Sequence, residues 1–227
     1  MAPANPIMAP FFGDADKSSK IAQKSSSPLT IFDWDDTLLC TTFIESLGEG
    51  KYPEVPDMAK ELLQHIEHQA YRLLWQAISL GDVCIVTNAD ALWIYNSAAK
   101  YLPGLLPLFN LVTIISARDL FEENYPGEPG RWKLLAFFNL TSQRDISLID
   151  QFVVIGDATY EIDAARAVGE QFSAVQVKTV KLKENPTAVQ VLYQLHELSD
   201  AFPGLVSMNA GVNCDLGRYL SEEAHLL

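Results

Sequence analysis

The stretch LTIFDWDDT, residues 29–37, joins an apolar segment directly to a cluster of acids. Residues 29–32 form a short apolar run, which predicts a buried β-strand. Asp33 and Asp35 follow at once, so the backbone at the end of that strand is expected to hold both carboxylates in place. The stretch therefore predicts a strand that delivers acids to one edge of a sheet.

Apolar runs alternate with helical patterns through most of the remaining chain. We predict further strands at residues 83–86, 111–115, 152–155 and 173–177, and helices at 57–80, 92–101, 131–140, 161–168 and 187–198. This alternation predicts an α/β fold with a central parallel sheet and right-handed crossovers. Beyond Pro203 the pattern fades and predicts no element.

Length and composition predict one folded domain with loose ends. The chain has 227 residues, of which 48% are hydrophobic, and this is enough to bury a core. Residues 1–28 are rich in Ala, Pro, Ser and Lys and are expected to be a disordered N-terminal leader. The folded domain is expected over residues 29–200, followed by a C-terminal extension, residues 201–227, to which we assign no structure.

Charge and cysteine content narrow the range of partners. The net charge of -13 and the isoelectric point near 4.6 argue against a nucleic-acid partner or an anionic membrane surface. No apolar run reaches the roughly 18 residues that a membrane span needs. Three cysteines without disulfide or zinc spacing fit a reducing compartment, the cytoplasm. One small basic cluster is expected to be a solvated strand end: Lys178, Lys181 and Lys183.

Carboxyl ends of parallel strands are where sites form in such sheets, and the acids after the first strand suit phosphoryl transfer. Asp33 is the candidate nucleophile, because a carboxylate held by the backbone can attack phosphorus in line. Asp35 lies two residues on and is the candidate general acid and then base. Trp34, between these two acids, is expected to shape the mouth of the site. Thr37 belongs to the same turn and is predicted to contribute to substrate binding.

The other strand ends supply candidates for the phosphate-binding groups. Thr87 and Asn88 follow the second strand and are expected to orient phosphoryl oxygens. Lys133, which opens a helix, is expected to neutralise the nucleophile and the phosphoryl group. Arg118 and Lys100 are competing cations.

Several carboxylates at one point repel each other unless they share a hard cation, and Mg²⁺ prefers oxygen ligands. The predicted metal set comprises Asp33, Asp157 after the fourth strand, the backbone carbonyl of Asp35, and Glu161, which would order metal-bound water. Asp163 competes with Glu161 for the role of supporting acid. The sequence thus predicts a magnesium site.

These residues resemble, in order, the four motifs of the haloacid dehalogenase-like hydrolase superfamily over roughly residues 29–180. The D-x-D-x-T motif is met at residues 33–37, the Thr that ends a hydrophobic strand at Thr87, the lysine at Lys133, and the last acid motif at residues 156–161. The resemblance implies a Rossmann-like three-layer sandwich, Mg²⁺ dependence and an aspartyl-phosphate intermediate on Asp33. The acid at Asp35 indicates phosphatases or phosphotransferases and not dehalogenases.

Two connections decide how open the site is. The segments after the first and third predicted strands are too short for the cap domain that members of this superfamily commonly insert there. An uncapped site admits large phosphorylated substrates, such as phosphoproteins or nucleic-acid ends, although the acidic surface argues against the latter. The leading hypothesis is a phosphate monoester phosphatase. Two further hypotheses are a phosphotransferase or mutase, and a non-enzymatic interaction module with the same fold.

Overall fold

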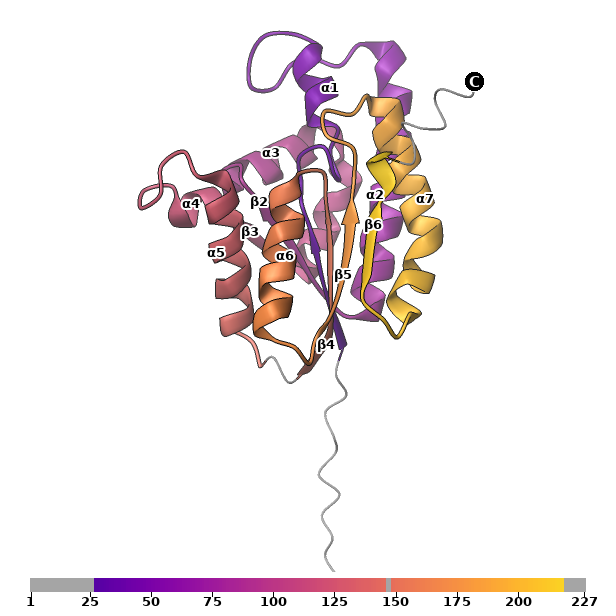
Figure 1. Cartoon of the computed structure of the whole chain (residues 1–227). Coiled ribbons are helices and arrows are strands. Elements are labelled where there is room, and N and C mark those ends of the chain that lie inside the picture. The colour runs from indigo at the N-terminus through magenta and orange to yellow at the C-terminus, as the bar shows by residue number, and fades with distance from the viewer. Residues whose placement is uncertain (1–26, 146–147, 219–227) are drawn as a thin grey trace, which may run out of the picture.

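The central feature of the fold is a six-stranded sheet, all of whose strand pairs are parallel, in the order β3-β2-β1-β4-β5-β6 (Figure 1). The computed structural model describes residues 27–145 and 148–218. The predicted α/β fold with a central parallel sheet is confirmed. The strands are β1 (Ser27–Phe32), β2 (Asp82–Thr87), β3 (Thr113–Ser116), β4 (Ile149–Gly156), β5 (Gln176–Lys181) and β6 (Val212–Asp215).

Helices cover both faces of this sheet, which gives the three layers of a Rossmann-like sandwich. Two apolar cores lie between the layers: α2 and α7 pack on one face, and α5 and α6 pack on the other (Figure 1). The helices are α1 (Thr41–Ser46), α2 (Asp57–Leu80), α3 (Ala91–Tyr101), the 3₁₀ helix η1 (Pro103–Leu111), α4 (Ala117–Phe121), α5 (Pro129–Ser142), α6 (Thr159–Gln171) and α7 (Ala188–Ser207).

Short connections leave the carboxyl edge of the sheet uncapped, as predicted. Within the described residues, the chain from β1 to α2 contains only α1, and the chain from β3 to α5 contains only α4. Among all the described residues, no helix is long and apolar enough to cross a membrane.

The predicted strands at 111–115 and 173–177 are displaced in the structure. β3 begins only at Thr113, because the apolar residues before it form η1. β5 runs from Gln176 to Lys181. The prediction ended this strand at residue 177 because the lysines that follow interrupt the apolar run.

The C-terminal part is more ordered than the fading pattern suggested. α7 continues to Ser207, so the predicted boundary between residues 200 and 201 falls inside a helix, and β6 then joins the sheet beside β5. Of the predicted leader, residues 1–26 lie outside the described residues, while Ser27 and Pro28 begin β1.

Lys178 corrects the prediction of a solvated basic strand end. Its side chain is completely buried, and its ammonium donates hydrogen bonds to the carbonyls of Leu205 (2.8 Å) and Val206 (2.9 Å) at the end of α7. The last carbonyls of a helix lack partners within it, so a lysine that reaches them is stabilising there. Lys178 is therefore a helix cap in the core.

Candidate functional site

Three neighbouring strands bring the predicted residues to one edge of the sheet. β1 lies between β2 and β4, and all three run in the same direction. The backbone directly after β1 is fixed to β4, because the Asp33 amide donates to the carbonyl of Ile155 at 2.9 Å. Asp33, Thr87 and Asp157 consequently emerge side by side at the carboxyl ends of adjacent strands.

Lys133 is the centre of a cluster of acids at this edge of the sheet, which we call the acid cluster and which comprises Asp33, Asp35, Asp157 and Glu161. It lies on the first turns of α5 with 1% of its surface exposed, and its Nζ lies 2.5 Å from Asp33 Oδ1 and 3.0 Å from Glu161 Oε1. It also donates to the carbonyl of Val86 at 2.5 Å. Burial alone lowers the pKa of an ammonium, but the charges of the two carboxylates outweigh it and raise the pKa of Lys133. The raised pKa and the two carboxylate partners favour the charged form of Lys133, which is held against the predicted nucleophile.

The Asp35 carboxylate is fixed by three donors. Its Oδ1 accepts from Thr41 Oγ1 at 2.6 Å and from Trp93 Nε1 at 2.7 Å, and its Oδ2 accepts from Thr87 Oγ1 at 3.3 Å. Burial, followed by the charge of Asp33, raises the pKa of Asp35 to about 6, although the three donors oppose this. A carboxyl that titrates near neutral pH can both give and take a proton.

Thr41 and Trp93 were not predicted as site residues. Thr41 opens the short α1, and Trp93 lies in the first turn of α3, where a tryptophan in sequence is indistinguishable from a core residue. The expectation that Trp34 shapes the mouth of the site is wrong. Trp34 is completely buried and donates its indole N–H to Ser97 Oγ at 3.0 Å.

Asp157 and Glu161 complete the acidic side of the site. Burial, followed by the charges of Asp33 and Glu161, raises the pKa of Asp157 to about 8. Glu161 is buried, and its Oε2 accepts from the backbone N–H of Ala158 at 3.0 Å. Gly156 permits this approach, since a Cβ there would lie 2.8 Å from Glu161 Cγ. Of the two acids considered for the supporting role, Glu161 is the one that joins the cluster.

Asp163 and two of the candidate cations are engaged away from the cluster. Asp163 is exposed and pairs with Arg166 at 3.4 Å. Arg118 pairs with Glu122 at 2.8 Å, and Lys100 pairs with Glu54 at 2.5 Å. Lys133 is thus the one of the three predicted cations that the fold brings to Asp33.

Asp36 is part of the turn that presents the two catalytic candidates. It adopts a left-handed backbone conformation, with φ of 52°, and its carboxylate accepts from the amide (2.9 Å) and the hydroxyl (2.5 Å) of Thr42. These bonds satisfy a free N–H at the start of α1. Thr37 is only 1% exposed, and its hydroxyl has no hydrogen-bond partner among the described residues. The predicted role of Thr37 in substrate binding stays a prediction, and its side chain is buried in the turn.

Asn88 ties two elements together at the edge of the site. Its amide donates to the carbonyl of Pro129, the first residue of α5, at 3.2 Å. Thr87, one residue earlier, is completely buried and accepts from the Ala89 amide at 3.0 Å while donating to Asp35. The two residues predicted to orient phosphoryl oxygens are therefore engaged in fixing β2, α5 and Asp35.

The donor set fits a hard cation. Among the described residues no three His, Cys, Asp or Glu side chains form a ready-made metal cluster. Asp35 and Glu161 are committed to protein donors and Asp33 Oδ1 is committed to Lys133, which leaves Asp33 Oδ2, the Asp157 carboxylate and a backbone carbonyl as possible ligands. Mg²⁺ suits such a site, because it keeps several waters and uses only one or two carboxylates. Burial first, and then the same excess of negative charge, raises the pKa of Asp157.

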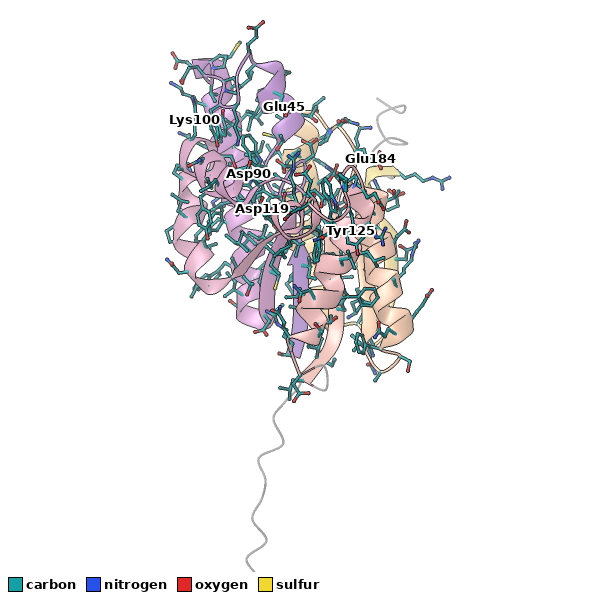
Figure 2. All side chains as sticks on the ribbon, turned by 90° about the vertical axis from the view of Figure 1, so that its left-hand side faces the viewer. Glu45, Asp90, Lys100, Asp119, Tyr125 and Glu184 are labelled. Atoms are coloured by element: carbon teal, nitrogen blue, oxygen red, sulfur yellow. The ribbon has the colours of Figure 1, made fainter. Side chains whose placement is uncertain are left out.

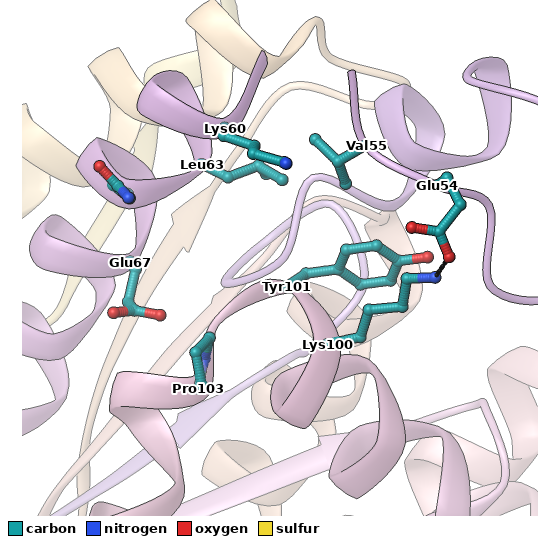
Figure 3. A pocket seen from close by; sticks show the side chains of 9 residues that line it. Glu54, Val55, Lys60, Leu63, Glu67, Lys100, Tyr101 and Pro103 are labelled. Atoms are coloured by element: carbon teal, nitrogen blue, oxygen red, sulfur yellow. Dashed lines mark hydrogen bonds and ion pairs between the residues drawn. The ribbon is translucent and has the colours of Figure 1, made fainter. Parts of the chain in front are cut away.

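A separate pocket of about 330 Å³ lies between α2, α3 and the loop before α2 (Figure 3). Its walls carry Lys60 and Lys100, but each is paired with an acid, Asp57 at 2.7 Å and Glu54 at 2.5 Å. Of the predicted site residues, only the competing cation Lys100 lines it. The acid cluster and this pocket are therefore distinct features.

No protein-family model, curated protein or solved structure matches this chain. The class is defined by fold and site alone: a Rossmann-like α/β protein with a buried lysine and a carboxylate cluster at the carboxyl edge of its sheet. A fold of this class does not define a function by itself, so the side chains at the carboxyl edge of the sheet are the basis for a functional proposal.

Proposed function

We propose that this chain is a Mg²⁺-dependent phosphatase of the haloacid dehalogenase-like type that hydrolyses a phosphate monoester through an aspartyl-phosphate on Asp33. The observation that supports this most is the charged Lys133, buried between Asp33 and Glu161, next to an Asp35 whose pKa is raised to about 6. A nucleophile, a proton donor and a positive charge thus meet at one point.

In the first step, an Asp33 carboxylate oxygen attacks phosphorus and the bond to the leaving oxygen breaks. Asp35 gives its proton to that oxygen, so an alcohol departs and an acyl phosphate remains. Lys133 neutralises part of the charge on Asp33 and on the transferring group.

In the second step, water attacks phosphorus, Asp35 takes up a proton from it, and the bond between phosphorus and Asp33 breaks. Inorganic phosphate leaves and both carboxyls return to their starting states. Thr41, Thr87 and Trp93 keep Asp35 in one orientation through both proton transfers.

Asp33, Asp157 and the carbonyl of Asp35 are the groups that would hold Mg²⁺. A bound Mg²⁺ supplies positive charge that offsets repulsion between the carboxylates and the phosphate. Glu161 is engaged with Lys133 and Ala158, so it supports the site from behind. A cytoplasmic setting is part of the proposal, and the free cysteines support it.

The experiment is p-nitrophenyl phosphate hydrolysis with Mg²⁺, with and without excess EDTA. Asp33→Asn is expected to lower kcat at least about 10³-fold, because the amide is no nucleophile. Asp163→Asn is the matched control and should retain activity, since Asp163 is exposed outside the cluster. Activity of Asp33→Asn equal to that of the parent would refute the assignment. Release of inorganic phosphate, as opposed to transfer to an added alcohol, separates hydrolysis from phosphotransfer.

A further inference from the structure

The mouth of the candidate site is surrounded by a ring of exposed, mainly acidic loops. We call this ring the rim and define it as residues 41–56, 88–91, 117–131 and 181–187, which follow the carboxyl ends of β1, β2, β3 and β5. Figure 2 shows four rim acids, Glu45, Asp90, Asp119 and Glu184, spread across this part of the molecule. Acids outnumber bases on the rim: Glu45, Glu49, Glu54, Asp90, Asp119, Glu122, Glu123, Glu128 and Glu184 against Lys51, Arg118, Arg131, Lys181 and Lys183.

Most of the rim's positive charge is already neutralised within the rim. Four ion pairs account for it, with N–O distances between 2.8 and 3.3 Å: Lys51 with Asp90, Arg118 with Glu122, Arg131 with Glu128, and Lys181 with Glu184. Among the described residues, Lys183 is the one rim base without a carboxylate partner. In the same part of the chain, Glu45, Glu49 and Glu123 are exposed acids without a cation. The rim therefore carries unpaired negative charge.

This charge has the wrong sign for a substrate whose body is anionic. A nucleotide, a polyphosphate or a nucleic-acid end brings negative groups beyond the reacting phosphate, and the rim offers them one free base. A body that carries positive groups gains from Glu45, Glu49 and Glu123 instead. The net charge of -13 for the whole chain strengthens the same preference at longer range.

We propose that the substrate is a phosphorylated peptide segment of a protein, with Lys or Arg on both sides of the phosphorylated residue. The connections of the described residues place no cap domain over this edge, which leaves it open to a polypeptide, and the rim's free acids match basic flanks in charge. This inference deepens the proposed function and rests on it, because it concerns the substrate of the same site.

The test compares three phosphopeptides that differ only in their flanks, which are basic, neutral or acidic. At low ionic strength kcat/KM for the basic peptide is expected to exceed that for the acidic one at least about tenfold, and the ratio should shrink as salt is added. Fluorescence anisotropy with the Asp33→Asn variant and labelled peptides measures binding affinity without turnover, and the affinities are expected to follow the same order as kcat/KM. Equal values for the three peptides, or preference for the acidic one, would overturn the inference.

Variants of rim residues test whether the rim acids cause the preference for the basic peptide. Glu45→Gln combined with Glu123→Gln is expected to reduce the basic-to-acidic ratio about threefold. Glu170→Gln is the matched control, since Glu170 is exposed near the far end of α6 and should leave the ratio unchanged. An unchanged ratio in the double variant also counts against the inference. If p-nitrophenyl phosphate is hydrolysed without any peptide preference, only this inference fails; if no ester is hydrolysed, the proposed function fails with it.

Discussion

Two lysines, Lys133 and Lys178, are both buried in this small domain, with 1% and 0% of their surfaces exposed. Lys133 lies at the carboxyl edge of the sheet against two carboxylates. Lys178 lies in β5 against neutral groups, among them the carbonyls of Leu205 and Val206. Burial is the same, and the acceptors differ.

The consequence appears in the direction of the two pKa shifts. For Lys178, burial lowers the pKa and only Asp150 opposes it. For Lys133, burial is outweighed by Asp33 and Glu161, and the pKa rises. Carbonyl dipoles satisfy an ammonium without adding charge, whereas carboxylates bring charge that a substrate or metal can use. A buried lysine thus indicates a functional site when its partners are acids, and a structural role when they are carbonyls.

Of the two buried lysines, the larger effect is expected at Lys133. Lys133→Met removes the charge that neutralises Asp33, so kcat with p-nitrophenyl phosphate should fall about 10² to 10³-fold. The two carboxylates left without their partner should also cost about 3–5 kcal/mol in free energy of unfolding. Steady-state kinetics and urea unfolding measure the two losses.

Lys100→Met is the matched control for this variant. Lys100 is paired with the exposed Glu54, so its loss should change kcat less than about twofold. If Lys133→Met kept a third or more of the parental kcat, the contrast between the two buried lysines would lose its functional meaning.

The next effect is a dependence of the free energy of unfolding on pH, which follows from the buried carboxyl groups of the site. The pKa of Asp35 is raised to about 6 and that of Asp157 to about 8, so both bind protons more tightly in the folded chain than in the unfolded one. Their stabilisation is complete below about pH 4 and is lost as pH rises through 6 and then 8, by about 1.4 kcal/mol per pH unit for each group. Unfolding in urea with EDTA should show this decline.

Two comparisons check the source of the decline. Asp157→Asn should flatten the curve between pH 7 and 8, above the raised pKa values of Asp35 and Glu161. Mg²⁺ should restore stability at pH 8, because a cation favours the ionised carboxyls. A free energy of unfolding that stays level from pH 5 to 8 in EDTA would contradict the prediction.

Much of the fold could be predicted because its strands are continuous apolar runs. β1, β2 and β4 are largely buried. A polar residue marks the edge of the sheet at each of them, because β2 ends in Thr87 and Asp33 and Asp157 directly follow β1 and β4. The strand predicted at 173–177 is displaced from β5 because Lys178 and Lys181 interrupt the apolar pattern of β5, although neither side chain is freely solvated. Sequence shows residue type and does not show that a lysine can find carbonyls in the core.

The candidate site was predictable where a residue follows a strand directly. Asp33, Thr87 and Asp157 are placed by the backbone of adjacent strands, so order along the chain was enough. Thr41 and Trp93 were missed because helix α1 and helix α3 orient them toward Asp35 through tertiary packing, which leaves no local signal.

A smaller effect is expected at Lys178, on stability alone. Lys178→Met leaves the carbonyls at the end of α7 without their donor, so the free energy of unfolding should fall by about 1–3 kcal/mol. The kcat of the folded fraction should stay as in the parent, because Lys178 lies outside the acid cluster. Lys60→Met, which removes an exposed pair with Asp57, should cost at most about 0.5 kcal/mol. A loss of kcat in folded Lys178→Met would erase the distinction between the two lysines.

Trp93 extends the comparison from charged partners to a neutral donor, and its effect should be the smallest. Trp93→Phe removes one of three hydrogen bonds to Asp35 but keeps a ring to stack on Tyr52, whose centroid lies 5.4 Å away. Because Thr41 and Thr87 still hold the carboxyl, kcat should fall only about three- to tenfold with little change in KM. Trp75→Phe, on the exposed surface of α2, should change neither constant. A change in KM alone would mean that Trp93 contacts substrate and does not act through Asp35.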